Sequence, residues 1–217
     1  MRTIQPLCVS DGMVNKLNFQ HAKWSELNHA YGEASDVPEL IEALTTDDAH
    51  KFEEALNELL SNIWHQGTIY DATVKALPLL LDLFKNGSVK AIDDLALLII
   101  LIASGKGYHQ VHSSSLRINP FTHEPVEVPC DLEDKLSKEN SVVNQTRAII
   151  EPYLNLLVPY LAHEDGELRR VTAQAMCCYP LHKSEYLALL RTALQKENNE
   201  DVIPYIKDSI DFLSTNT

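Results

Sequence analysis

Nine histidines are the residues of this chain best suited to chemistry, because histidine titrates near neutral pH and is the commonest metal ligand. His109 and His112 lie three residues apart, and Glu124 follows in the same polar segment. A metal site of this kind would need an HExxH motif, paired CxxC motifs or a compact His/carboxylate spacing, and the sequence has none of these. The spacing therefore predicts no metal site.

Nucleophilic catalysis would need an activated cysteine or serine beside a base. Cys177 and Cys178 are adjacent at a predicted helix end, where small residues pack against the next element and thiols are typically buried and inert. The serines at 113–115 lie in a polar segment without a local motif. The sequence thus predicts no catalytic residue and no cofactor, and we expect that the chain is not an enzyme.

The elements that would position any site are predicted to be paired helices. The apolar residues from Phe52 to Ile63 follow the spacing of one helix face, which predicts a helix over 48–64. Gly67 is expected to cap this helix in a left-handed conformation, and Asp36 is expected to cap a shorter helix before it. Similar apolar spacing predicts further helices over 36–44, 71–85, 92–103, 132–150, 154–161, 168–176, 187–194 and 202–213.

The paired helices recur with a nearly regular period. Leu44 and Leu83 precede equivalent turns 39 residues apart, and Leu161 and Leu194 do so 33 residues apart. Two-helix solenoid repeats span about 34 residues in the tetratricopeptide class and about 40–47 in the HEAT class, and no tetratricopeptide Trp-Leu-Gly pattern is present. We therefore predict a single all-α domain over 1–217, a HEAT/armadillo-like α-solenoid of about four helical hairpins, with an N-terminal cap at 1–37 and a loop insertion at 104–130.

The segments outside the hairpins have weaker patterns. Trp24 and Tyr31 are expected to cover the open end of the first hairpin, because a terminal repeat must hide its core. A β pattern is confined to Val126–Val128, which two prolines bracket within the insertion. After the insertion, Asp131 is expected to cap the next helix, and Pro152 is expected to kink or restart that helix.

The net charge and the absence of sorting signals exclude several classes of function and location. The chain has 18 Lys and Arg against 31 Asp and Glu, a net charge of −13, which repels nucleic-acid phosphates and favours a basic protein partner. The N-terminus lacks the apolar core of a secretory signal, and the longest apolar run, Leu95–Ala103, has nine residues, whereas a membrane helix needs about 20. Four cysteines without paired spacing suit a reducing compartment. We expect a cytoplasmic protein that binds neither nucleic acid nor membrane, of undetermined oligomeric state.

Two separated motifs occur in order within Trp24–Leu81. Their residues are Trp24, His29-Ala30-Tyr31-Gly32, Ala34, Asp36-Val37-Pro38, His65-Gln66-Gly67-Thr68, Tyr70, Ala72 and Ala76-Leu77-Pro78. This segment resembles a family of bacterial HEAT-repeat domain-containing proteins. The resemblance implies an armadillo-type superhelix without catalysis, and some members of the family look like immunity proteins that neutralise a toxin from the same genome.

Negative charge is concentrated in the first hairpin, where Glu33–Leu60 holds nine acids and one lysine and so contributes −8 of the net −13. In HEAT-type stacks the second helices form a concave binding surface, and a helical wheel places polar residues opposite the apolar stripe of the first such helix. His65 has an alternative role in satisfying backbone carbonyls at a helix end. The predicted partner-binding residues are Asp47, Glu54, Glu58, His65, Tyr205, Asp208 and Asp211.

Together these patterns predict a non-catalytic protein-binding module that acts as an immunity protein against a basic toxin. Nuclease toxins are commonly basic because they approach phosphates, so an acidic inhibitor would compete with the nucleic acid. One alternative is a general HEAT-repeat scaffold or adaptor, in which the acidic exterior serves only solubility. A HEAT-fold DNA glycosylase is a third possibility, but it would need a basic groove, which the net charge of −13 opposes.

Overall fold

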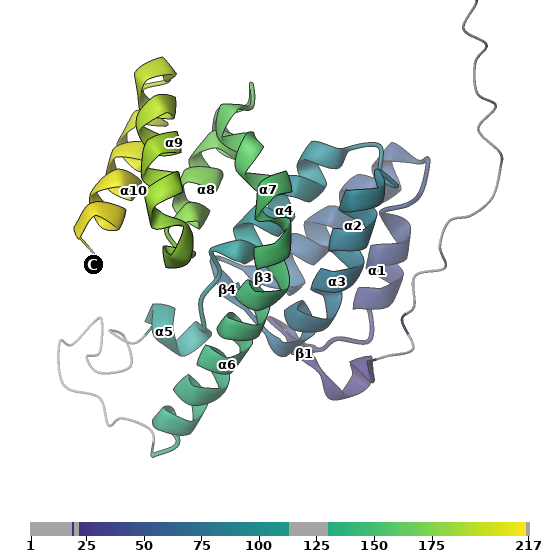
Figure 1. Cartoon of the computed structure of the whole chain (residues 1–217). Helices are drawn as coiled ribbons and strands as arrows, with labels where there is room; N and C mark the ends of the chain where they lie inside the picture. The colour runs from purple at the N-terminus through teal and green to yellow at the C-terminus, as the bar shows by residue number, and fades with distance from the viewer. Residues whose placement is uncertain (1–18, 20–21, 113–129, 216–217) are drawn as a thin grey trace, which may run out of the picture.

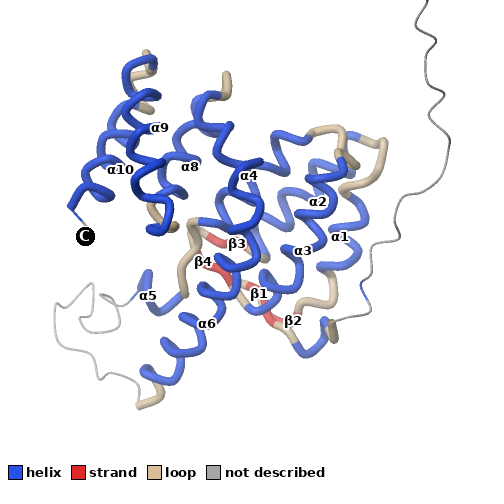
Figure 2. The backbone as a smooth tube through the Cα atoms, in the orientation of Figure 1, coloured by secondary structure: helices blue, strands red, loops and turns tan. Residues whose placement is uncertain are grey.

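The computed structural model describes residue 19 and residues 22–112 and 130–215, and this part of the chain is mostly helical, as predicted (Figure 1, Figure 2). The α-helices are α1 (Val37–Ala43), α2 (Ala49–Asn62), α3 (Asp71–Asn86), α4 (Ile92–Ala103), α5 (Tyr108–His112), α6 (Leu132–Ile150), α7 (Leu154–Leu157), α8 (Gly166–Met176), α9 (Lys183–Lys196) and α10 (Ile203–Thr215). Short 3-10 helices are η2 (Trp24–Glu26), η3 (Glu151–Tyr153), η4 (Val158–Ala162) and η5 (Pro180–His182). Four two-residue strands form two antiparallel hairpins, β1 (Asn28–His29) with β2 (Gly32–Glu33) and β3 (Trp64–His65) with β4 (Thr68–Ile69).

The helices pack in pairs that follow one another along the chain. Helix α1 contacts α2, α3 contacts α4, η4 contacts α8, and α9 contacts α10. The second members of these pairs also contact one another in order, through α2, α4, α8 and α10, and we call them the second layer. The first layer consists of α1, α3, α6 and then η4 with α9. The pairs run from α1 and α2 at one end of the molecule to α9 and α10 at the other (Figure 1).

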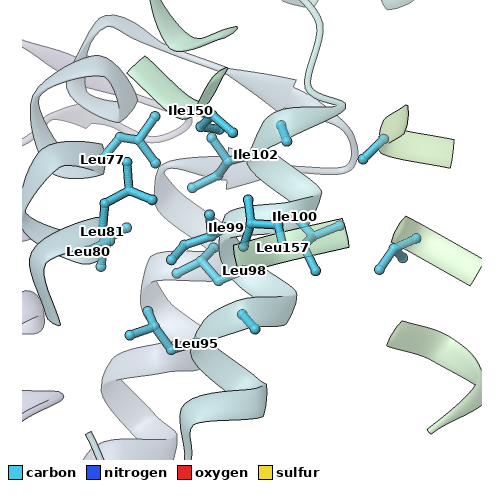
Figure 3. Packing of buried hydrophobic residues seen from close by; sticks show 14 of the residues in the cluster. Leu77, Leu80, Leu81, Leu95, Leu98, Ile99, Ile100, Ile102, Ile150 and Leu157 are labelled. Atoms are coloured by element: carbon cyan, nitrogen blue, oxygen red, sulfur yellow. The ribbon is translucent and has the colours of Figure 1, made fainter. Parts of the chain in front are cut away.

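Helix α4 lies at the centre of the core. It contacts α2, α3, α6 and α8, and its side chains Leu95, Leu98 and Ile99 are fully buried. Figure 3 shows these side chains beside the leucines of α3 and near Ile150 and Leu157. A helix that is apolar on all sides is a buried helix, which confirms the interpretation of the nine-residue apolar run. Burial of each large side chain contributes about 1.5–3 kcal/mol to folding.

The two β-hairpins were not predicted, and they correct the role of Gly67. Helix α2 ends at Asn62, and the chain then turns back between β3 and β4. Gln66 and Gly67 occupy this turn with φ values of 50° and 91°. Two consecutive positive φ angles are what a two-residue hairpin loop requires, so Gly67 serves the turn and does not cap α2.

Two predicted N-cap residues are confirmed in position but make no side-chain capping bond, and the predicted role of Tyr31 is wrong. Asp36 directly precedes α1, but its side chain makes no capping bond. The Asp131 side chain also caps nothing, and it instead lies 2.9 Å from Nζ of Lys135. Tyr31 is 67% exposed and so covers no core, whereas Trp24 is buried as expected. Helix α6 ends at Ile150, and η3, which contains Pro152, leads into α7, which agrees with the prediction that the helix restarts at this proline.

The insertion at 104–130 begins with ordered structure where a loop was predicted. The backbone of Lys106 donates to Gly67 O at 3.0 Å and accepts from Ile69 N at 2.9 Å, which attaches the chain to β4. Helix α5 follows and packs against α6. Residues 113–129, which include the predicted β pattern at Val126–Val128, lie outside the described residues.

Candidate functional site

Helices of the second layer begin with acidic residues for a local reason. Asp48 precedes α2 and accepts two backbone N–H bonds from its first turn, at 3.0 and 3.3 Å. Asp165 precedes α8 and accepts one at 2.8 Å. Asp93 and Asp94 lie in the first turn of α4, where carboxylates complement the positive end of the helix dipole. Helix capping at α2 and α8 and the helix dipole at α4 thus concentrate carboxylates at these N-termini.

The packing of the pairs brings these N-termini into a row along one edge of the molecule, at the top of Figure 1. Nζ of Lys90 lies 2.6 Å from Asp47, which joins the turn between α3 and α4 to the turn between α1 and α2. Nε2 of His163 lies 3.4 Å from Asp93, which joins the turn between η4 and α8 to the start of α4. We call the exposed carboxylates along this row the acidic edge, and they are Asp47, Asp48, Glu53, Asp93, Asp94, Glu164, Asp165, Glu200 and Asp201.

A hollow of about 410 Å³ opens on the acidic edge between the start of α4 and the turn before α8. Its apolar lining comes mainly from Ile92, Leu97 and Leu168. Its polar lining consists of Lys90, Asp93, Asp94, His163, Glu164 and Asp165. Because lysine and arginine combine an apolar stem with a charged head, a basic side chain of a partner matches both parts of this lining.

The electrostatics of the hollow favour a cation. Burial and then the nearby carboxylates of Asp93, Asp165 and Glu53 raise the pKa of Asp94. A helix N-terminus supplies only about half a positive charge, whereas two carboxylates stand in the first turn of α4 alone, so the edge stays negative. The hydroxyl of Tyr160 donates to Asp93 at 3.1 Å, and burial followed by this bond raises the pKa of Tyr160 to about 12. Tyr160 therefore remains a neutral donor.

A buried ion pair fixes the turn between η4 and α8 against the turn between α9 and α10. Arg169 donates to Glu197 through Nε at 2.6 Å and Nη2 at 2.9 Å, and its Nη1 donates to the backbone carbonyls of His163 and Glu164, both at 2.8 Å. The Glu197 side chain is only 5% exposed. Its hydrogen bonds with Arg169 lower the pKa of Glu197, so this carboxylate is ionised at neutral pH. We call this arrangement the turn clamp.

The structure distributes the predicted partner-binding residues over several places. Asp47 lies on the acidic edge and pairs with Lys90, whereas Glu54 and Glu58 line a groove between α1 and α2. His65 lies in β3, where Nδ1 is 3.4 Å from the hydroxyl of Tyr31. The remaining residues, Tyr205, Asp208 and Asp211, are exposed on α10, with the guanidinium of Arg170 over the Tyr205 ring.

Sequence reasoning missed the four carboxylates that line the hollow. Asp93 and Asp94 are separated from Glu164 and Asp165 by about 70 residues, so only the packing of α4 against α8 brings them together. The available signal was the recurrence of acids in or just before the first turn of each second helix. Counting acids within 33–60 alone did not reveal that pattern.

The β-hairpins gather residues of the two sequence motifs at the edge opposite the acidic edge. The His29 ring accepts from Tyr31 N at 3.0 Å through Nδ1, and its Nε2 lies 3.0 Å from Asp36. The other carboxylate oxygen of Asp36 accepts from Asn62 at 2.7 Å. Both ring nitrogens of His29 are thus occupied, so this network fixes the first β-hairpin to α2 and leaves no free base on that ring.

Other chemically able groups are also committed to structure. Glu139 of α6 accepts from the backbone N–H of His109 and lies 2.6 Å from its ring, which holds α5 against α6. Burial raises the pKa of both Cys177 and Cys178, so each is a thiol at neutral pH. A thiol is a poor nucleophile because the thiolate is the reactive form.

The described part of the chain contains no group of three or more His, Cys, Asp or Glu residues arranged to hold a metal ion. Among its helices none combines the length and apolar character needed to cross a membrane. Comparison with protein-family models, curated proteins and solved structures gave no match.

Proposed function

We propose that this chain is a HEAT/armadillo-like α-solenoid that binds a basic protein without catalysing a reaction, and that it acts in the cytoplasm as an immunity protein against a basic toxin. The observation that carries the proposal is the hollow on the acidic edge, which four carboxylates from successive helix pairs line together with apolar side chains, Lys90 and His163. A basic side chain of the partner enters this hollow. The toxin is held inactive because the residues it uses to approach phosphates are then covered.

The pattern of helix contacts supports the solenoid assignment. In an α-solenoid, first helices contact first helices and second helices contact second helices along the stack. The contacts through α2, α4, α8 and α10 follow this order, and those of α1, α3 and α6 do so as well. The departure is in the third pair, whose first member is divided among α6, η3, α7 and η4. The two proline-led segments η3 and η4 account for this division, because proline disrupts the helical hydrogen bonds before it.

The charge of the edge supports a basic partner on kinetic and energetic grounds. A negative surface accelerates the diffusional encounter with a basic protein, in some complexes to about 10⁸ M⁻¹s⁻¹ or more at low salt. Burial raises the pKa of Asp94, and repulsion from the carboxylates of Asp93, Asp165 and Glu53 raises it further in the free protein. A bound cation would relieve that repulsion, so binding would lower the pKa of Asp94 and release a fraction of a proton near that pKa.

Charge reversal at the hollow tests the proposal. Asp94 and Glu164 line the hollow, and neither side chain caps a helix or belongs to the turn clamp. The proposal predicts that a gene for a basic toxin lies beside the gene for this chain. The variant D94K/E164K should weaken binding of that gene's product by about 2–4 kcal/mol, or roughly 30- to 700-fold, measured by titration calorimetry. The same variant should fail to restore growth of cells that express that product.

A matched control comes from α6. Glu133 and Asp134 are exposed acids in its first turn, at the end of the molecule away from the acidic edge, so E133K/D134K makes the same change in net charge. We expect this control to retain affinity within about threefold and to restore growth, because distant surface charges are screened. Equal affinity of both double variants would remove the hollow from the interface.

A scaffold or adaptor without a toxin is the second candidate, and one observation favours it. Tyr31, in the turn between β1 and β2, is 67% exposed, and Tyr108, at the start of α5, is 48% exposed. Both elements lie away from the acidic edge (Figure 1), and tyrosines are enriched in binding hot spots. Two surfaces of different chemistry would allow the chain to join two partners. Simultaneous binding of two unrelated proteins, with no toxic product from either adjacent gene, would favour this alternative.

A further inference from the structure

The outer face of the first helix pair contains a groove of about 550 Å³ between α1 and α2. Its floor consists of Leu40, Ala43 and Ala55. The charged and polar residues around that floor are Asp36, Glu39, Lys51, Glu54, Asn57 and Glu58. The groove is therefore apolar along its floor and mainly acidic along its walls.

This groove occupies the place that another helix would fill if the stack continued. The buried side chains Val37 and Ile41 of α1 and Leu59 of α2 belong to the core, on the side where α1 contacts α3 and α2 contacts α4. The groove residues lie on other faces of the same two helices. Small floor residues such as Ala43 and Ala55 allow a helix axis to approach to about 8–10 Å. The shape of the groove thus fits a helix.

The sign of the charge distinguishes this face from the outer face of an ordinary terminal repeat. A terminal repeat needs a polar outer face for solubility, but that requirement does not favour one sign. The last pair meets it with both signs, because α9 and α10 expose Arg191, Lys196, Lys207, Asp208 and Asp211. In the first pair, Glu39, Glu54 and Glu58 face a single lysine, Lys51. The Asp36 carboxylate is already bonded to His29 and Asn62.

We infer that the groove between α1 and α2 binds a basic amphipathic helix of a protein partner, with one apolar stripe on Leu40, Ala43 and Ala55 and with flanking lysine or arginine residues paired with Glu39, Glu54 and Glu58. This inference rests on the proposed function, because it names the element of a basic partner that docks. The bound helix extends the stack by one element and covers an apolar floor that the described residues leave open.

A synthetic peptide tests the groove without the natural partner. The probe is a fluorescein-labelled amphipathic lysine/leucine peptide of about 18 residues, long enough to form a helix, and its control is a shuffled peptide of identical composition. Binding is measured by fluorescence anisotropy at about 0.15 M salt, where weak charge attraction is screened. We expect the amphipathic peptide to bind at least about tenfold more tightly than the shuffled peptide, because only the amphipathic peptide presents an apolar stripe to the floor of the groove. The two peptides have the same charge, so charge attraction alone would bind them equally.

Two variants locate the peptide. Ala43→Leu fills the floor without changing charge and should weaken binding about tenfold or more, whereas the matched variant Ala188→Leu on the exposed face of α9 should leave it unchanged. E54K/E58K should weaken binding about 10- to 100-fold, compared with the control E133K/D134K. Amide hydrogen exchange of each variant should match that of the parent chain, which separates loss of binding from loss of fold.

The outcomes separate this inference from the proposed function. Equal binding of the amphipathic and shuffled peptides, or equal effects of A43L and A188L, would overturn the inference that the groove binds a helix. Loss of peptide binding in D94K/E164K with full binding in A43L would move the helix to the acidic edge, so the groove would fail while the proposed function stood. Peptide binding at the groove with no basic partner for the acidic edge would support the groove and contradict the proposed function.

Discussion

The turn clamp gives the most sharply defined stability prediction. Substitution of Glu197 by Gln preserves the shape of the side chain and an oxygen that can accept from the backbone N–H groups of Asn198 and Asn199, at 3.1 and 2.9 Å in the parent chain. It removes the negative charge that faces Arg169. The variant therefore tests the charge of the pair rather than the packing of the side chain.

The magnitude follows from the surroundings of the pair. Removal of one partner from a buried ion pair typically destabilises a protein by about 3–5 kcal/mol, because the other charge remains uncompensated. Arg169 keeps two backbone carbonyls as acceptors and is 16% exposed, so its charge is partly satisfied without Glu197. We therefore expect a loss of about 2–3 kcal/mol, which corresponds to roughly 30- to 140-fold in an equilibrium constant.

Native-state hydrogen exchange measured by mass spectrometry is the appropriate assay, because stacked helix pairs can open separately. Exchange in α9 and α10 should accelerate by the factor given above, while exchange in α1 should stay unchanged. The matched control is E167Q, which breaks the neighbouring and more exposed pair between Glu167 and Arg170 and should change stability by about 0.5 kcal/mol or less. An equal effect of the two variants, or faster exchange throughout the chain, would refute the clamp.

The pH dependence supplies a second check on the same pair. Hydrogen bonds with Arg169 hold the pKa of Glu197 below its usual value in the folded chain. A carboxyl with a lowered folded-state pKa stabilises the fold fully above its unfolded-state pKa, which is about 4.3, and this contribution is lost as pH falls through the folded-state pKa. The parent chain and E197Q should therefore differ most near neutral pH, and the difference should shrink in acid.

Three other predictions concern the core, the hollow and the thiols. Ile99→Ala should destabilise the chain by about 2–5 kcal/mol in chemical denaturation, because Ile99 is fully buried in α4 and leaves a cavity. Asp94→Asn should stabilise the free chain at neutral pH by about 0.5 kcal/mol or less, because the raised pKa of Asp94 means that its ionised form opposes folding. This gain should shrink as pH falls through the raised folded-state pKa and vanish below the unfolded-state pKa, where the carboxyl is neutral in both states. Iodoacetamide should alkylate exposed Cys130 before Cys177 and Cys178, whose pKa values burial raises, and peptide mapping would contradict this if the adjacent pair reacted first.

The sequence was sufficient to place most helices because their apolar spacing is strong and local. Helix α3 was predicted over 71–85 and spans Asp71–Asn86, and α4 agrees with its predicted range as well. The β-hairpins could not be found in this way, because a two-residue strand is too short to show an alternating pattern. Gly67 illustrates the ambiguity, since a left-handed glycine after a helix is equally suited to a cap and to a hairpin turn.

The candidate site was less predictable because it depends on contacts between distant segments. Asp36 has the sequence signature of a cap, yet it bonds to His29 and Asn62, which only the folded chain brings within reach. The hollow likewise requires α4 to lie beside the turn before α8. Sequence spacing within a helix specifies which residues share a face, but it does not specify which helix will cover that face.

The acids of the edge have two possible explanations, and one substitution separates them. Asp165 caps α8 by accepting an N–H bond at 2.8 Å, and it also lines the hollow. Asparagine caps helices about as well as aspartate, so Asp165→Asn should preserve stability within about 0.5 kcal/mol while it removes one charge from the hollow. If the carboxylates recognise a basic partner, D165N should weaken binding about tenfold, whereas D48N, which changes the equivalent cap of α2 outside the hollow, should weaken it much less. Equal affinity of D165N and the parent chain would mean that this carboxylate is present for capping alone.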